Sequence, residues 1–344
     1  MPGLNGRDRK VRFGLIGAGR IADSYMQSFS SASNASLVAV ADVRAEAAKA
    51  LGEAARCKAY ESHTQLMDAE VCDAVIVATP PSTHEEICLD ALSRSIPVLC
   101  EKPVCMRLDT AIRLRDIAEQ AGVLFTMASK FRYADDVVRA KAIVTSGLLG
   151  KVVLFENTFM ARVDMTSRWN SNPSISGGGV LIDNGTHSVD IMRYFLGPLS
   201  EIWVAECCHI QGLPVEETVR VLVRSNCGVL GSMDLSWSLN KEADYYVVIY
   251  GTQGTLRVGW KQSSYRQSSA SDWVVFGKGY DKVSAFRNQI ENFAGAILGT
   301  DTLRITADDA IASVEAVQAA YKAMEQGQWT PVSTYSQVMA AAAN

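Results

Sequence analysis

The chain has 344 residues, a formal net charge of −4 and 48% hydrophobic residues. This length predicts about two domains, each with enough apolar residues for its own core. The small negative charge, without a strongly basic run, argues against a nucleic-acid or membrane-surface protein. The polar opening stretch 1–10 and the lack of a long apolar run indicate neither a secretory signal nor a membrane anchor, so we expect a cytoplasmic protein.

The first third of the chain alternates between two kinds of pattern. Apolar runs predict strands at 11–16, 37–41, 74–78, 96–100 and 123–128. Helical patterns separate them at about 20–30, 44–55, 83–94 and 108–121. This alternation is typical of a parallel sheet with helices on both faces.

The first expected strand runs into the motif Gly17-x-Gly19-x-x-Ala22. Gly17 permits a tight turn, Gly19 lets a pyrophosphate approach the backbone, and Ala22 lets helix and strand pack closely. The second strand ends at Asp42, twenty residues beyond Ala22, where a dinucleotide-binding fold places the carboxylate that holds the adenosine ribose. The alternative is that Asp42 only caps the next helix.

Two more polar segments follow expected strands, where open parallel sheets bind their ligands. In the first, 79–84, the prolines stiffen the turn and Thr79 can meet a cofactor, whereas His84 could simply begin a helix. In the second, Lys102 stands between Glu101 and Pro103, and an X-Pro bond in such a turn can be cis. An ammonium group fixed there could stabilise negative charge on a substrate oxygen. An ordinary loop lysine is the alternative.

Beyond residue 131 the alternation of strand and helix patterns stops. A helical segment near 134–147 precedes β-branched and aromatic runs at 151–159, 201–206, 218–224, 228–237, 245–250 and 254–260. Short connections predict a largely antiparallel sheet, and helical patterns follow at about 283–298 and 306–326. We therefore expect an α/β dinucleotide-binding domain at 1–131 and an α+β domain with a large, mainly antiparallel open sheet at 132–344.

A triple glycine at 177–179 precedes an expected helix that ends at Gly197. Within it Asp183 and His187 are spaced i,i+4, and His187 and Asp190 i,i+3, so the three share one face. The glycines permit close approach of a ligand or of another backbone. The alternative is a solvated helix face on which the histidine has no role.

The eight cysteines are spread along the chain without a Cys-x-x-Cys pair. In a chain of this length they predict reduced thiols rather than a disulfide framework. Cys207, Cys208 and His209 are adjacent but lack a second ligand pair at zinc spacing, so we predict no metal site.

Together these segments resemble the glucose-fructose oxidoreductase/inositol dehydrogenase/MocA family over nearly the whole chain. The resemblance rests on GLIGAGRIA at 14–22, Asp42, ATPPSTH at 78–84, EKP at 101–103, SGGGVLIDNGTH at 176–187 and GTQGTL at 251–256. The combination of EKP with GGG-x-x-x-D-x-x-x-H is far more specific than any one motif. It implies a Rossmann domain followed by a domain that binds substrate on the sheet face toward the cofactor and commonly oligomerises through the other.

The resemblance also implies site residues. The catalytic set would be Lys102, Asp183 and His187. The cofactor-binding positions, to which Pro80 is added from its turn, would be Gly17, Gly19, Arg20, Ile21, Asp42, Thr79, Pro80, His84, Glu101 and Lys102. Arg132 falls where the family often has an arginine near the nicotinamide, although Lys130 stands where asparagine is usual.

These residues predict an NAD(P)-dependent oxidoreductase that moves a hydride between nicotinamide and a ring carbon bearing a secondary hydroxyl, in a sugar, glycoside or cyclitol. His187 is the favoured base because imidazole titrates near neutral pH and Asp183 can orient it. Lys102 would polarise the substrate oxygen. The reverse assignment, with Lys102 as base, stays open. Trp169 could offer an apolar face to a sugar ring, with core packing as the alternative.

Two other functions remain open: an NAD-dependent enzyme that cleaves glycosides by oxidation and elimination, and a non-catalytic dinucleotide-sensing regulator. We expect NAD to be preferred over NADP because Asp42 would repel a 2′-phosphate, with Arg44 as a partial rescue. We also expect a homodimer or homotetramer, formed through an outer sheet face that carries Val221, Val223, Val248 and Tyr250.

Overall fold

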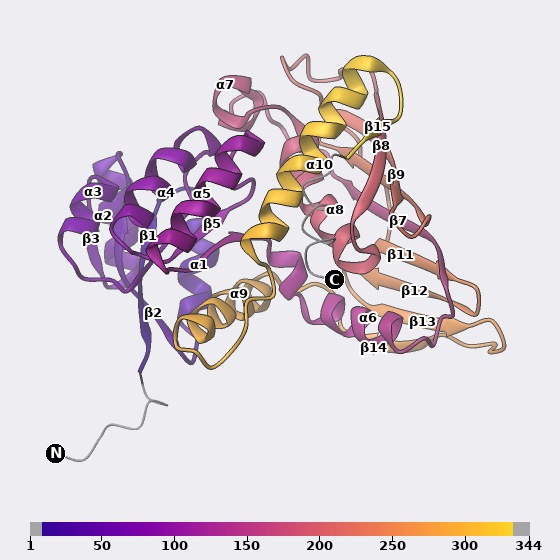
Figure 1. The fold of residues 1–344 in the computed structure, drawn as a ribbon, viewed down its shortest axis with the longest axis horizontal. Helices are drawn as coiled ribbons and strands as arrows, with labels where there is room; N and C mark the ends of the chain where they lie inside the picture. Colours follow the sequence, from indigo (N-terminus) through magenta and orange to yellow (C-terminus); the bar gives the residue numbers. More distant parts are fainter. Residues whose placement is uncertain (1–8, 333–344) are drawn as a thin grey trace. The chain divides into compact units, whose positions relative to one another are not determined.

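The computed structural model describes residues 9–332, which form two compact units. The first comprises residues 9–105 together with 109–133 and 282–310 (Figure 1). The second comprises, among the described residues, 106–108, 134–281 and 311–332. The expected boundary after residue 131 lies close to the break after 133, but the segment 282–310 returns to the first unit.

The first unit contains a six-stranded parallel sheet in the order β3-β2-β1-β4-β5-β6. Its strands are β1 (Val11–Ile16), β2 (Ala35–Ala41), β3 (Lys58–Tyr60), β4 (Ala74–Val77), β5 (Val98–Glu101) and β6 (Phe125–Ala128). The parallel sheet expected from the alternating pattern is confirmed. Val75, Ile76 and Val77 are fully buried, as in strands that are covered on both faces.

The helices of this unit alternate with the strands along the chain (Figure 1). They are α1 (Ala22–Phe29), α2 (Ala45–Ala55), α3 (His63–Asp68), η1 (Pro81–Thr83), α4 (His84–Ser93), α5 (Leu108–Ala121), η2 (Lys130–Tyr133) and α9 (Lys282–Ile297). Helix α9 completes the core from far down the sequence. The rings of Phe286 and Tyr25 lie 4.7 Å apart, and those of Phe293 and Phe13 lie 6.1 Å apart.

The second unit contains a nine-stranded sheet in the order β14-β13-β12-β11-β7-β10-β9-β8-β15. Its strands are β7 (Val152–Met160), β8 (Leu199–Glu206), β9 (Thr218–Ser225), β10 (Leu230–Ser236), β11 (Tyr245–Gly251), β12 (Gly254–Gly259), β13 (Ser263–Gln267), β14 (Val274–Gly277) and β15 (Thr330–Pro331). Strands β7 and β10 pair in parallel and the other neighbours are antiparallel. The mainly antiparallel sheet is therefore confirmed.

One face of this sheet is packed against helix α8. The helices of the second unit are α6 (Asp135–Thr145), η3 (Trp169–Ser171), α7 (Pro173–Ser176), α8 (Val180–Leu196) and most of α10 (Ala307–Gln326). Gly231 of β10 leaves room for Met192 of α8, and the rings of Phe155 and Phe195 lie 5.8 Å apart. The start and the end of α8 agree with the expected helix.

The predicted outer face of the sheet was partly assigned to the wrong residues. Val221 and Val223 are fully buried, and Val223 is paired with Gly231, which contacts α8. Because strand side chains alternate between faces, the opposite face carries Arg220 and Leu222 instead. Val248 is half-buried on that face, paired with Glu156, and Tyr250 lies there too, as expected.

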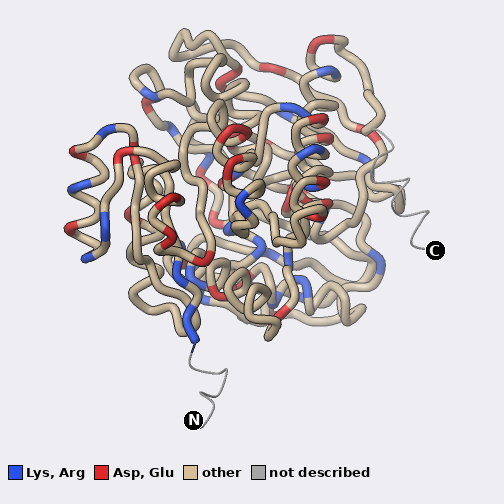
Figure 2. Tube along the Cα trace, turned by 60° about the vertical axis from the view of Figure 1, so that its left-hand side comes forward, with Lys and Arg blue, Asp and Glu red and all other residues tan. Residues whose placement is uncertain are grey.

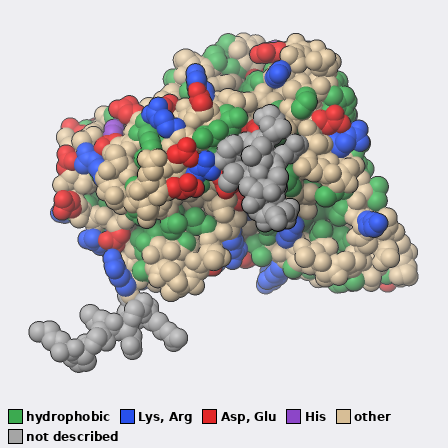
Figure 3. Space-filling model, in the orientation of Figure 1, with side chains coloured by type: hydrophobic (Ala, Val, Ile, Leu, Met, Phe, Trp, Pro, Cys, Tyr) green, Lys and Arg blue, Asp and Glu red, His purple; other side chains and the backbone are tan. Residues whose placement is uncertain are grey.

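The surface mixes both signs of charge. Figure 2 shows acidic and basic residues interspersed along the trace, and Figure 3 shows apolar side chains scattered among them on one face. Between residues 9 and 332, no helix combines the length and apolarity that crossing a membrane requires. All eight cysteines are free thiols, as expected.

Candidate active site

The glycine motif forms the turn between β1 and α1. Gly17 has φ +109°, and a Cβ there would lie 2.6 Å from the carbonyl oxygen of Ala78, so only glycine fits. A Cβ at the exposed Gly19 would meet no protein atom within 4 Å. Arg20 is exposed beside it, and Ile21 is the N-cap residue of α1. The turn therefore leaves open space where the motif predicts a pyrophosphate.

Asp42 ties this turn to the end of β2. Its Oδ2 accepts a hydrogen bond from the Ala18 N–H at 2.7 Å, and its Oδ1 accepts bonds from the N–H and Nε of Arg44 at 2.9 and 3.1 Å. Burial raises the pKa of Asp42, but the bonds from Arg44 and Ala18 outweigh burial and lower it overall. The N-cap residue of α2 is Arg44, so the alternative that Asp42 only caps that helix is wrong.

His84 links the two loops that follow β4 and β5. Its ring is completely buried, with Nε2 2.8 Å from the Thr79 carbonyl oxygen and Nδ1 2.9 Å from that of Pro103. Burial lowers its pKa despite these carbonyls. His84 is also the first residue of α4, so it both begins a helix and fastens the loops. The half-buried Pro80 accepts a bond from the Thr83 hydroxyl in the same turn.

A buried tyrosine, Tyr25, is hydrogen-bonded to the Glu101–Pro103 segment. The Tyr25 hydroxyl donates to Glu101 Oε1 at 2.7 Å, and the Lys102 N–H donates to Glu101 Oε2 at 3.2 Å. The Lys102–Pro103 peptide bond is cis, as considered from the sequence. Burial and the neighbouring Glu101 raise the pKa of Tyr25, which keeps its hydroxyl a donor. The backbone of Lys102 is therefore fixed at the carboxyl end of β5.

Arg132 lies in η2 with only 5% of its surface exposed. Its guanidinium donates to Asp309 Oδ1 at 3.2 Å and to the carbonyl oxygen of Arg304 at 3.4 Å. These contacts hold the first unit together, and the substrate-binding role considered for Arg132 stays a prediction.

The acidic and histidine stripe of α8 is not a solvated surface. His187 is 5% exposed, Asp190 is fully buried and Asp183 is half-buried one turn before His187. The alternative of a solvated helix face is therefore wrong, whereas a catalytic role for His187 stays a prediction. A buried histidine with a carboxylate one turn away can act as a base whose protonated form the carboxylate stabilises.

The triple glycine before α8 accommodates protein atoms. A Cβ on Gly178 would collide with the Tyr321 hydroxyl, and a Cβ on Gly179 with the backbone carbonyl of Glu216. Of the two explanations weighed from the sequence, close approach of another backbone therefore accounts for Gly179. The sequence pattern carried no signal for Glu216 or Tyr321, because both reach this turn from distant segments.

Trp169 and Trp260 are two of the three tryptophans that the second unit exposes to solvent, the third being Trp329. Trp169 in η3 is 43% exposed, so core packing does not explain it. Trp260, which was not anticipated, is 39% exposed and lies 6.0 Å from the ring of Phe159. Asn184 of α8 contacts the Phe159 carbonyl oxygen at 3.5 Å, so Trp260 lies near the turn that carries Asp183.

The structure thus assembles two groups of predicted residues. The cofactor group lies at the carboxyl ends of neighbouring parallel strands of the first unit, and Lys102 belongs to it. Asp183 and His187 lie on one helix of the second unit. That Lys102 converges with them on one substrate oxygen stays a prediction.

Comparison with family models decides the classification. Residues 11–129 match the model described as "Oxidoreductase family, NAD-binding Rossmann fold", and residues 137–257 match the GFO/IDH/MocA C-terminal domain. The chain belongs to the Gfo/Idh/MocA oxidoreductase family. The resemblance drawn from the motifs is confirmed, and the first unit is the NAD(P)-binding Rossmann domain of this family member.

The curated relatives of this chain include proteins that are named as sugar and inositol dehydrogenases. It is 26% identical over 325 residues to the rhizopine catabolism protein MocA of Rhizobium meliloti, covering 90% of this chain and 94% of the relative. It is 33% identical over 188 residues to glucose-6-phosphate 3-dehydrogenase of Bacillus subtilis, covering 53% of each chain. The solved complex of levoglucosan dehydrogenase with NADH and levoglucosan has a TM-score of 0.87 at 20% identity, covering 94% of this chain and 100% of that one, which shows the shared fold.

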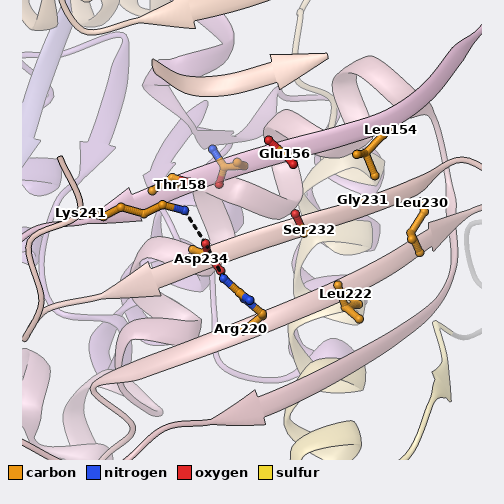
Figure 4. Close-up of a pocket in the computed structure, with 11 residues that line it drawn as sticks. Leu154, Glu156, Thr158, Arg220, Leu222, Leu230, Gly231, Ser232, Asp234 and Lys241 are labelled. Carbon is orange, nitrogen blue, oxygen red and sulfur yellow. Dashed lines mark hydrogen bonds and ion pairs between the residues drawn. The ribbon is translucent and has the colours of Figure 1, made fainter. Parts of the chain in front are cut away.

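A separate hollow of about 340 Å³ lies on the open face of the sheet in this oxidoreductase (Figure 4). Arg220 and Lys241 both pair with Asp234 there, at 2.7 Å each. Leu154 of β7 and Leu222 of β9 line the same hollow. These side chains come from β7, β9, β10 and the segment after β10, on the face opposite α8. The hollow is therefore distinct from the Asp183 and His187 stripe.

Proposed function

We propose that this protein is an NAD(P)-dependent dehydrogenase that interconverts a secondary alcohol and a ketone on the ring of a sugar, glycoside or cyclitol. The observation that carries the proposal is the buried His187 one helical turn from Asp183, in a chain whose other unit fixes Lys102 at a strand end. A purely dinucleotide-sensing protein needs neither residue, which favours catalysis over sensing.

The proposed chemistry assigns one proton to the protein. In the oxidation direction His187 takes the hydroxyl proton and becomes imidazolium, and the neighbouring Asp183 side chain stabilises that charge. The Lys102 ammonium donates a hydrogen bond to the same oxygen and favours its developing negative charge. Bound nicotinamide supplies the hydride acceptor. In the reverse direction the imidazolium returns the proton to the oxygen of the new alcohol.

The geometry around Asp42 supports a preference for NAD. Its carboxylate is ionised and held beside the glycine turn, so it can accept hydrogen bonds from ribose hydroxyls and would repel a 2′-phosphate. Arg44 already pairs with Asp42 and is 65% exposed, so it offers only partial compensation to NADP. We therefore propose a preference rather than exclusion.

Relatives and exposed aromatic faces support a cyclic polyol as the substrate class. The relatives include proteins named glucose-6-phosphate 3-dehydrogenase and inositol 2-dehydrogenase. Trp169 and Trp260 of the second unit could each stack against the apolar face of such a ring. His84 and Glu101 would act by holding the cofactor loops, since both are engaged with protein groups.

The test is a screen of sugars, inositols and glycosides for NADH formation by the purified protein with added NAD. We expect turnover of at least one ring alcohol that depends on His187. Cleavage of a glycoside without added cofactor, by protein that carries NAD through purification, would replace this proposal with the oxidation and elimination reaction. Failure of every ring alcohol with either cofactor would refute it.

We also propose that the protein is a homodimer or homotetramer built on the open sheet face. Val248, Tyr250, Leu222 and Leu154 give that face apolar surface between charged pairs. Sedimentation at micromolar concentration tests this, and a monomer would contradict it. A cytoplasmic location stays a prediction from the sequence.

A further inference from the structure

We infer that Glu216 and Tyr321 are positioning residues that set the start of α8 and thereby the alignment of Asp183 with His187. The catalytic consequence rests on the proposed function, whereas the effect on His187 itself does not. Neither residue belongs to the motifs that identify the site, and both come from segments remote from α8 in sequence.

The Glu216 carboxylate satisfies the first N–H groups of α8. Its Oε1 accepts hydrogen bonds from Gly179 at 2.8 Å and from Leu181 at 3.1 Å, and its backbone carbonyl accepts one from Val180 at 2.9 Å. The first N–H groups of a helix have no partner within the helix. The N-cap residue of α8 is Gly179, which has no side chain to supply one, so Glu216 provides the cap from outside the helix.

Tyr321 holds that carboxylate in place. Its hydroxyl donates to the same Oε1 at 2.7 Å. Burial and the neighbouring Glu216 raise the pKa of Tyr321, so the hydroxyl stays protonated and remains a donor. Burial also raises the pKa of Glu216, opposed by the bonds from Tyr321, Gly179 and Leu181. Glu216 is 6% exposed, so these bonds replace water for a buried carboxylate.

Gly178 and Gly179, which precede α8, leave the space that Tyr321 and Glu216 occupy. A Cβ at Gly178 would occupy the position of the Tyr321 hydroxyl, and a Cβ at Gly179 that of the Glu216 carbonyl. Three backbone N–H groups and two adjacent glycines therefore fix the first turn of α8 against Glu216. Asp183 closes this first turn, since its N–H donates to the Gly179 carbonyl at 3.1 Å.

The consequence is a fixed start for the helix that carries the proposed base. If Gly179 or Leu181 loses its acceptor, the first turn can fray, and Asp183 loses the position from which it faces His187. A catalytic group that is misplaced by about 1 Å can cost about 100-fold in rate. Glu216 and Tyr321 would thus act through Asp183 without contacting the substrate.

The experiment is a double-mutant cycle read out on His187 by NMR. The chain has only four histidines, so the imidazole signals can be assigned by substitution. Asp183→Asn should lower the pKa of His187 by about one unit, because the charge partner is lost. Glu216→Gln and Tyr321→Phe should each produce part of that fall, and neither should add to it in the Asp183→Asn background. Tyr321→Phe keeps the Glu216 carboxylate, so its effect separates position from charge.

The matched control is Asp136→Asn in the same unit. Asp136 is also buried and also accepts a backbone N–H, from Gly279 at 2.8 Å, together with the Ser263 hydroxyl at 2.6 Å, and neither of these donors belongs to α8. This variant should lower thermal stability and leave the pKa of His187 unchanged. With a substrate that the wild-type enzyme oxidises, Glu216→Gln and Tyr321→Phe should each lower kcat by about tenfold to 100-fold and leave the KM for NAD unchanged.

The inference is overturned if the pKa of His187 is unaltered in Glu216→Gln and Tyr321→Phe, or if it falls equally with and without Asp183. The second result would mean a direct charge effect. If no ring alcohol is oxidised, the proposed function fails while the NMR cycle still decides whether the pair positions Asp183.

Discussion

Glu217, the neighbour of Glu216, should make the stability of this protein depend on pH. Its side chain is fully buried, and burial alone would raise its pKa. The Ser238 hydroxyl at 2.6 Å and the N–H groups of Gln211, Leu213 and Ile210 donate to the carboxylate and outweigh burial, which lowers its pKa to about 2. From an ordinary value of 4.5 this shift corresponds to about 3 kcal/mol of folding free energy at neutral pH.

The sign follows from proton binding. Between pH 4.5 and 2 the unfolded chain holds the Glu217 proton and the folded chain does not, so this stabilisation is complete above about pH 4.5 and is lost as pH falls through about 2. We expect Glu217→Gln to unfold at lower urea concentration at pH 7. Its deficit relative to wild type should shrink by roughly half at pH 3.

The assay is urea unfolding at pH 7 and pH 3, followed by tryptophan fluorescence. The exposed Asp272→Asn serves as the control, since Asp272 bonds only its neighbour Ser271 among the contacts described. A deficit of the same size at both pH values would refute the reasoning, because the loss would then come from packing and not from the ionised carboxylate.

Three further predictions concern the cofactor, the sheet face and the base. Asp42→Ala should raise the ratio of NADP to NAD efficiency by about tenfold, roughly 1.4 kcal/mol, by steady-state kinetics; an unchanged ratio would show that Asp42 does not select. Val248→Asp on the open sheet face should dissociate the oligomer in sedimentation while NAD binding persists, and an unaltered assembly would place the interface elsewhere. Asp183→Asn should lower kcat and move the acid limb of its pH profile downward, and a profile with the wild-type midpoint would remove Asp183 as the partner of His187.

The elements that the sequence predicts well are those with long, regular patterns. Helix α8 ends at Gly197 as expected because the glycine adopts φ +77° there, and β1 is recognisable from an apolar run before a glycine turn. Strand β3 has only three residues, mostly exposed, and α3 only six, so neither leaves a pattern that periodicity can detect. Strands β13 and β14 were also not anticipated; β13 is polar.

The sequence alone could have shown which residues of β9 face the core and which face away from it. Arg220 and Arg224 alternate with Val221 and Val223, and charged residues rarely face a helix-covered core. The contacts of Glu216 with Gly179 could not have been predicted from the sequence, because they depend on how distant segments of the chain meet in the fold. For the same reason the sequence did not show that α9 joins the first unit.

The central claim is that His187 is the base of an NAD-dependent ring-alcohol dehydrogenase, and His187→Ala tests it most directly. With the best substrate from the screen, we measure kcat/KM by NADH formation and the Kd for NAD by titration. The account predicts a loss of about 10²–10⁴-fold in kcat/KM with the Kd for NAD nearly unchanged, since His187 lies in the second unit. Near-normal turnover in His187→Ala would contradict the account and transfer the role of base to Lys102.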